Sequence, residues 1–109
     1  MSASDSQAVT IVTRFTVAPE NQQRLIDIVI RAVEEEILRI PGFISTKIHK
    51  SMDGTHVLNY SQWESREAFE STLQRTDFIP YVQEILLIAT LEPDFYEMVA
   101  EFHGEGANG

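Results

Sequence analysis

The sequence predicts a single α+β domain in which strands and helices follow the order βαββαβ. Two observations predict this class: four segments alternate apolar and polar residues with period two, and two longer regions repeat apolar residues every three or four positions. The chain has 109 residues, of which 43% are hydrophobic and 23% charged. That length and composition are typical of one compact globular domain.

The first strand is predicted over residues 8–17, because apolar and β-branched side chains alternate there. Ala18-Pro19 ends it, and Pro19 is well placed near a helix start. Apolar residues then recur from Leu25 to Ile40 at helical spacing, which predicts an amphipathic helix of roughly five turns. Pro41-Gly42 supplies a helix breaker followed by a residue that tolerates positive φ.

Two further strands are predicted at 43–50 and 56–64, joined by a hairpin whose tip carries Asp53-Gly54. Ser65 is a good N-cap for a helix from Arg66 to about Arg75. Asp77 is expected to cap another helix, with an apolar stripe between residues 78 and 88. Pro80 falls in its first turn, where proline is tolerated.

The last strand is predicted over Phe95–His103, after the break at residues 92–94. Residues 1–7 and 104–109 are polar or glycine-rich and are expected to be flexible tails, which leaves residues 8–103 as the domain. This element order is that of the ferredoxin-like split βαβ fold, a four-stranded antiparallel sheet with helices on one face.

The face of the sheet away from the helices is not plainly polar. In the strand at 56–64, Leu58, Tyr60 and Gln62 lie opposite the side that carries Asn59 and Trp63. Apolar surface of this extent favours a partner sheet, so we expect a homodimer that pairs sheet on sheet.

Charge and cysteine content exclude several classes of function. Eight basic and seventeen acidic side chains give a net charge of −9, which opposes binding to nucleic acid or to anionic membranes. The absence of cysteine excludes disulfides and thiolate metal sites. Neither a signal peptide nor an apolar run of about 20 residues is visible, so a cytoplasmic protein is expected.

Few residues have the spacing of a catalytic motif. The three histidines, His49, His56 and His103, lack metal-ligand spacing, and no glycine loop for phosphate is present, so no metal or nucleotide cofactor is expected. Asn59, Ser61 and Trp63 share one face of a strand and would line a small cavity with hydrogen-bonding groups. The alternative is that Trp63 is a core residue and Asn59 bonds to the backbone.

The pattern Pro41-Gly42-Phe43, His49, Asp53-Gly54-Thr55 and then the segment from Asn59 to Phe69 resembles the antibiotic biosynthesis monooxygenase domain family. The resemblance extends from about Val9 to Phe102. It implies a dimeric α+β barrel that binds a small aromatic molecule. It also implies oxidation of flat phenols, quinols or anthrones by O₂, the co-substrate, without metal, flavin or haem.

By the same resemblance, Asn59 and Trp63 match the asparagine and tryptophan of the family's substrate pocket. Their N–H groups would donate to a developing oxyanion, and the indole face would stack on a flat ring. Ser61, Phe69 and Phe43 are expected to contact the substrate. Phe69 stands where some members carry tyrosine, and Gln83 or Glu84 stands where they carry arginine.

His49 is the candidate base near neutral pH, provided that it faces the same side as Asn59. A two-residue hairpin loop sets His49 opposite Leu58 on the other face, whereas a three-residue loop with a bulge sets it opposite Val57. An exposed histidine at the strand end is a third possibility that the sequence leaves open.

Other functions of the same fold also fit this sequence. A non-catalytic dimeric module that binds a small molecule, and a cyclase or isomerase that uses the same pocket, both remain alternatives. Haem degradation is disfavoured, because Leu73 stands where related haem-degrading proteins need an iron-ligating histidine.

Overall fold

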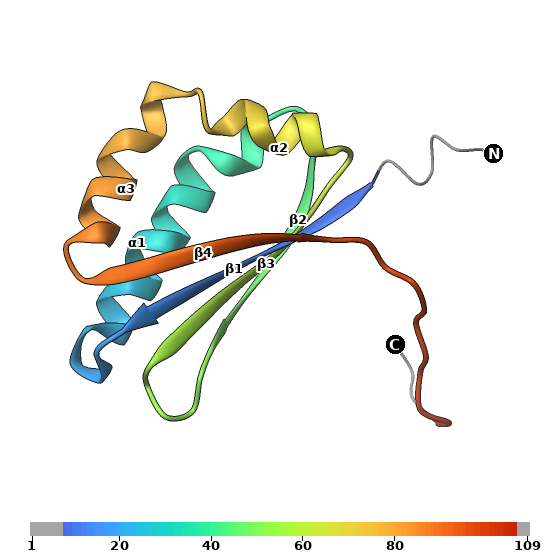
Figure 1. Ribbon diagram of the computed structural model, residues 1–109, viewed down its shortest axis with the longest axis horizontal. Coiled ribbons are helices and arrows are strands. Elements are labelled where there is room, and N and C mark those ends of the chain that lie inside the picture. Colours follow the sequence, from blue (N-terminus) through green and yellow to red (C-terminus); the bar gives the residue numbers. More distant parts are fainter. Residues whose placement is uncertain (1–7, 107–109) are drawn as a thin grey trace.

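The computed structural model describes residues 8–106, so the tail expected at 1–7 and the last three residues of the tail expected at 104–109 lie outside the described residues. Its sheet is antiparallel throughout and has the strand order β2-β3-β1-β4. The strands are β1 (Val9–Val17), β2 (Phe43–Lys50), β3 (His56–Trp63) and β4 (Ala89–Tyr96), and the helices are α1 (Gln22–Glu35), α2 (Arg66–Thr72) and α3 (Ile79–Leu86). All three helices cover the same face of the sheet (Figure 1). The predicted ferredoxin-like fold is therefore confirmed.

Strand register decides which side chains face the helices. Ile11 pairs with Ser61 and Thr13 pairs with Asn59 across the β1–β3 ladder. Paired residues share a face, so the odd-numbered residues of β1 and β3 all lie beneath the helices. Two buried clusters fill this layer, one around Leu25 and Val57 and the other around Ile11, Ile40 and Trp63. The second cluster packs against α2 and forms one end of the candidate site.

Helix α1 ends at Glu35, about one turn before the predicted end at Ile40. The backbone of Glu36 leaves the helical region (φ −127°, ψ −55°), and a 3₁₀ turn follows over Ile37–Arg39. This turn carries Ile40 into the core, where only 4% of its surface is exposed. The apolar spacing therefore continues past the helix, although the helix itself does not.

The prediction of the fourth strand at Phe95–His103 is wrong, because β4 occupies Ala89–Tyr96. Pro93 lies in the predicted break at residues 92–94, yet it pairs with Thr13 inside the ladder. β4 is an edge strand bonded only to β1, and an edge position tolerates proline because its missing N–H can face away from the partner. Residues 97–104 have no regular secondary structure and extend away from the domain (Figure 1).

The second helical region is broken into two helices. Ser65 caps α2 as predicted, with the Ala68 N–H donating to Ser65 Oγ at 3.1 Å. The helix stops at Thr72 instead of near Arg75. Asp77 makes no cap and instead pairs with Arg75 at 3.4 Å. Among the helices of residues 8–106, none is long and apolar enough to cross a membrane.

Candidate functional site

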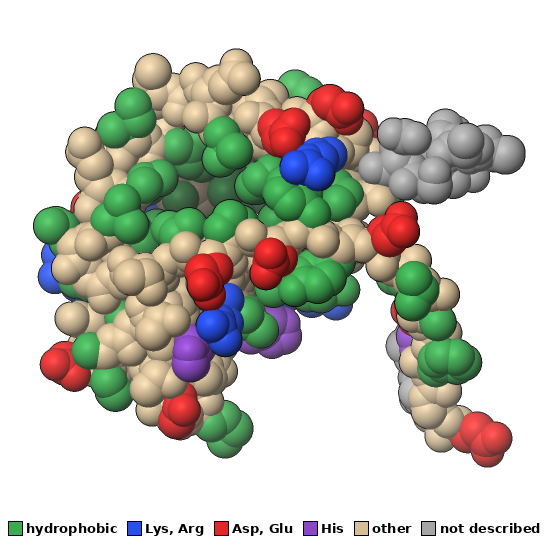
Figure 2. Space-filling view, viewed as in Figure 1, with side chains coloured by type: hydrophobic (Ala, Val, Ile, Leu, Met, Phe, Trp, Pro, Cys, Tyr) green, Lys and Arg blue, Asp and Glu red, His purple; other side chains and the backbone are tan. Residues whose placement is uncertain are grey.

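A cavity of about 410 Å³ lies between the helix-facing side of the sheet and the three helices. Figure 2 shows its mouth as a hollow lined largely by hydrophobic side chains. The volume falls within the range of small-molecule binding pockets, which is about 300–1,000 Å³. The polar or charged side chains in its wall are Thr13, Thr46, Asn59, Ser61, Trp63, Thr72, Arg75, Tyr81 and Gln83. A largely apolar cavity with polar groups at separate points of its wall suits an aromatic ligand that carries oxygen substituents.

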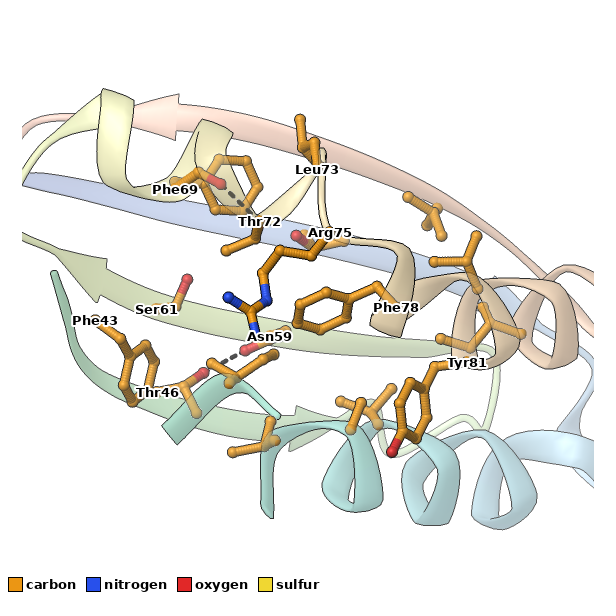
Figure 3. Close-up of a pocket in the computed structure, with 18 of the residues that line it drawn as sticks. Phe43, Thr46, Asn59, Ser61, Phe69, Thr72, Leu73, Arg75, Phe78 and Tyr81 are labelled. Carbon is orange, nitrogen blue, oxygen red and sulfur yellow. Dashed lines mark hydrogen bonds between the residues drawn. The ribbon is translucent and has the colours of Figure 1, made fainter. Parts of the chain in front are cut away.

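Asn59 lies in the middle of β3 and lines this cavity. The Thr46 hydroxyl on neighbouring β2 donates to Asn59 Oδ1, as the dashed line in Figure 3 marks. This bond orients the amide through its oxygen. Within residues 8–106 the structure records no protein acceptor for Asn59 Nδ2. Its two N–H donors are therefore available to a ligand.

Trp63 also lines the cavity, but its N–H is already bonded. Trp63 Nε1 donates to Ser61 Oγ at 3.1 Å, and Ser61 Oγ donates to the Ile11 carbonyl at 3.2 Å. The indole is only 2% exposed. The expectation that the indole N–H would face a substrate oxyanion is wrong for this arrangement. Trp63 provides an aromatic wall, and Ser61 holds that wall in place.

Phe43, Trp63 and Phe69 form the aromatic end of the cavity. The ring centroids of Phe43 and Trp63 are 5.2 Å apart, and those of Trp63 and Phe69 are 5.6 Å apart. Both pairs are edge-to-face, a geometry that aromatic rings favour. Phe43 reaches this side because of a register shift between Phe43 and Ser45, which pairs it with Trp63.

His49 does not reach the cavity, which corrects its candidacy as the base. It pairs with Leu58 and is exposed on the opposite face of the sheet. The Ser51 N–H donates to the His56 carbonyl at 2.9 Å, so the loop between them holds four residues. An even loop length gives the same facing as a two-residue loop. His56 and His103 are also absent from the lining, and residues 8–106 contain no cluster of three potential metal ligands.

Two cavity residues have roles that the sequence did not indicate. The Tyr81 hydroxyl donates to Glu35. That hydrogen bond raises the pKa of Tyr81 to about 12, so the phenol stays protonated near neutral pH. Arg75 lies between α2 and α3 and extends into the cavity (Figure 3). Hydrophobic periodicity does not single out Arg75, because the predicted helix runs from Arg66 to about Arg75. In the structure α2 ends at Thr72, so Arg75 lies beyond the helix.

Gln83 lines the cavity, whereas Glu84 is not among the lining residues and pairs with Arg31 at 2.5 Å. Tyr81 and Gln83 are therefore the polar residues that α3 contributes to the cavity. The positive charge of the described wall comes from Arg75.

Comparison with known proteins identifies the class. Residues 8–84 match the family model described as antibiotic biosynthesis monooxygenase. The tetracenomycin-F1 monooxygenase of Streptomyces glaucescens is 33% identical over 100 residues, which cover 92% of this chain and 89% of that protein. The chain therefore belongs to the antibiotic biosynthesis monooxygenase family.

Solved structures show the same fold. A monooxygenase from the gene ActVA-Orf6 of Streptomyces coelicolor, in complex with nanaomycin D, is 26% identical. It matches 92% of this chain and 95% of its own with a TM-score of 0.77. SnoaB of Streptomyces nogalater, a cofactor-independent oxygenase, is 23% identical, with 93% and 99% covered and a TM-score of 0.71. At that identity, SnoaB is evidence for the fold alone.

Proposed function

We propose that this protein is a monooxygenase that uses O₂, without a metal or organic cofactor, to oxidise a flat phenolic, quinol or anthrone-type molecule. The observation that carries the proposal is the Asn59 amide, oriented by Thr46 and bordering an apolar cavity with an aromatic end. The 33% identity to tetracenomycin-F1 monooxygenase supports the same class of reaction. The complex of the ActVA-Orf6 protein with nanaomycin D supports a small-molecule ligand for this fold.

The reaction balances without an external reductant. A ring CH₂ flanked by aromatic rings, or a ring CH para to a phenol, becomes C=O with one oxygen atom of O₂. The other oxygen atom leaves as water with two hydrogens of the substrate. The substrate itself thus supplies all four electrons that O₂ accepts, two for each oxygen atom. Molecular oxygen accepts the first electron readily only from the ionised, electron-rich form of such a substrate, so the protein must favour that form.

Asn59 is the group placed to favour the ionised substrate. Its N–H donors would face the substrate oxygen where negative charge gathers on deprotonation. The surrounding apolar wall weakens competition from water, which strengthens each hydrogen bond to the anion. Trp63 and Phe69 would hold the flat ring in position through their packed aromatic wall.

The proposed assembly is a homodimer joined through the face of the sheet away from the helices. Helices cover only one face, and the other carries Leu58 and Tyr60. The segment after β4 exposes 92% of Val99 and 90% of Phe102. A second copy packed on this face would cover both the sheet and the segment.

Oxygen consumption tests the proposal directly. Metal-free protein, prepared with a chelator, is mixed with a panel of anthrones and quinols, and O₂ uptake is recorded against the Asn59→Ala variant. We expect uptake with at least one substrate, formation of the quinone, and no loss of rate on chelation.

Other outcomes identify the alternatives. Conversion of a substrate without O₂ uptake would indicate a cyclase or isomerase. Tight binding without any conversion would indicate a non-catalytic binding module. Loss of activity with chelator, restored by a metal ion, would contradict the cofactor-independent mechanism.

A further inference from the structure

Arg75 is the only charged side chain among the described residues that line the cavity. The chain carries seventeen acidic residues, and none of the described ones lies in this wall. Figure 3 shows the guanidinium extended across the cavity toward Asn59, with Phe78 beside it. The described wall of the cavity therefore carries one positive charge, although the chain as a whole has a net charge of −9.

Arg75 lies in the short connection between α2 and α3. Its backbone is extended (φ −86°, ψ 124°), so the helical path does not continue through it. Its side chain is 40% exposed, and one terminal nitrogen contacts Asp77 at 3.4 Å. A guanidinium has five N–H donors, so this one long contact leaves most of them for a ligand.

We propose that Arg75 binds a negatively charged group of the substrate, so that the cavity selects planar aromatic anions over their neutral analogues. The anionic group is either a carboxylate on the ring system or an ionised phenol. This inference rests on the proposed function and specifies its substrate class. Guanidinium pairs with such oxygens through short, charge-assisted hydrogen bonds, which are stronger than those between neutral groups.

The ionisable groups of the wall support this assignment. The two that line the cavity are Arg75 and Tyr81, and the pKa of Tyr81 is about 12. With its pKa raised, Tyr81 stays protonated near neutral pH and cannot accept a proton from a substrate. No carboxylate or histidine is present among the described lining residues. A phenolic substrate therefore loses its proton to solvent rather than to a side chain in the wall. Arg75 favours binding of the form that has already lost its proton.

Binding to already oxidised ligands tests Arg75 without any turnover. Anthraquinone-2-carboxylate and anthraquinone-2-carboxamide are compared by isothermal titration calorimetry. We expect the wild-type protein to prefer the carboxylate by about tenfold, a modest value for a charged hydrogen bond because the site is partly exposed. Arg75→Gln should lose this preference, and Arg75→Lys should keep part of it. Arg24→Gln, which removes an exposed cation outside the cavity lining, is the matched control and should retain the preference.

A second variant should change the affinity for the carboxylate in the opposite direction. Asp77→Asn removes the carboxylate that contacts Arg75, so carboxylate binding should tighten severalfold while carboxamide binding stays unchanged. A purely structural role for the Arg75–Asp77 pair would weaken both ligands together. Titration of 2-hydroxyanthraquinone on either side of its pKa shows whether an ionised phenol is bound in the same way as a carboxylate.

The proposal fails if wild type and Arg75→Gln show the same ratio of affinities, or if wild-type protein binds none of the three ligands. These outcomes are independent of catalysis. A wild-type preference for anions that Arg75→Gln loses, in a protein that consumes no O₂, would support the role of Arg75 and contradict the proposed oxygenation. O₂ uptake with neutral substrates, together with equal affinity ratios for wild type and Arg75→Gln, would support the proposed oxygenation and contradict the role of Arg75.

Discussion

Trp63 Nε1 lies 3.1 Å from Ser61 Oγ, so the indole N–H is bonded within the strand instead of facing the cavity. Ser61 in turn donates to the Ile11 carbonyl on β1 at 3.2 Å. The chain of bonds ties the indole to the sheet and leaves Asn59 as the amide donor of β3 in this site. The two residues therefore have different roles: Asn59 is placed to bind an oxyanion, and Trp63 shapes the space beside it.

Asn59→Ala should lower kcat far more than it lowers stability. Loss of one donor to a developing oxyanion typically costs about 10²–10³ in rate. Asn59 is only half-buried and its recorded partner is the Thr46 hydroxyl, so the free energy of unfolding should fall by less than about 1 kcal/mol. Steady-state O₂ uptake and urea denaturation measure the two effects.

Thr46→Val is the matched control for Asn59. It removes the hydroxyl that orients the amide while leaving both amide donors in place, so kcat should fall by less than in Asn59→Ala. Equal rates for Asn59→Ala and wild type would show that the amide takes no part in the reaction.

Trp63→Phe and Ser61→Ala should both act mainly on stability. The first removes the indole N–H and part of a buried ring, and the second leaves that N–H without its acceptor. Each should lower the free energy of unfolding by about 1–3 kcal/mol. We expect kcat to fall by less than about tenfold in each, the range of a moderate change in positioning. A loss of 10²-fold or more in kcat with stability unchanged would instead mean that the indole N–H bonds to the substrate.

Removal of residues 97–109 should weaken the dimer without unfolding the domain. The segment after β4 exposes 62% of Met98 and most of Val99 and Phe102, so within one chain it adds little to the core. Light scattering should show that the full chain is a dimer at micromolar concentration. The shortened chain should have a larger dissociation constant, so that it is still monomeric at concentrations where the full chain is a dimer. A variant that lacks only residues 104–109 is the control and should resemble the full chain. A full chain that is monomeric would contradict the proposed assembly.

Asp53 should make stability depend on pH at the hairpin tip. Hydrogen bonds from the Thr55 side chain and backbone, and then from Ser51, lower its pKa from 3.8 to about 2. Because the folded pKa is the lower one, the contribution is fully present above pH 3.8 and is lost as pH falls through about 2. Thermal midpoints of wild type and Asp53→Asn should differ most near neutral pH and converge toward pH 2. A difference that stays constant with pH would contradict this.

Local pattern was sufficient for most of the fold and for the composition of one cavity wall. Side chains alternate along a strand whatever its surroundings, so Asn59, Ser61 and Trp63 had to share a face. The same alternation located β1, β2 and β3, and the cap residue Ser65 located the start of α2. Helix ends were predicted too late, because the apolar spacing of α1 continues through a 3₁₀ turn to Ile40.

Features that depend on pairing between distant segments could not be predicted from local pattern. Pro93 lies in a strand because β4 is at the sheet edge, and His49 faces away from the cavity because its loop holds four residues. Phe43 joins Trp63 through a register shift, and Arg75 enters the cavity because α2 stops at Thr72. Local alternation is therefore enough to show which residues share a strand face. Which faces meet, and which charge enters the space between them, depends on register, edge position and helix ends, and these are set by contacts among segments far apart in the chain.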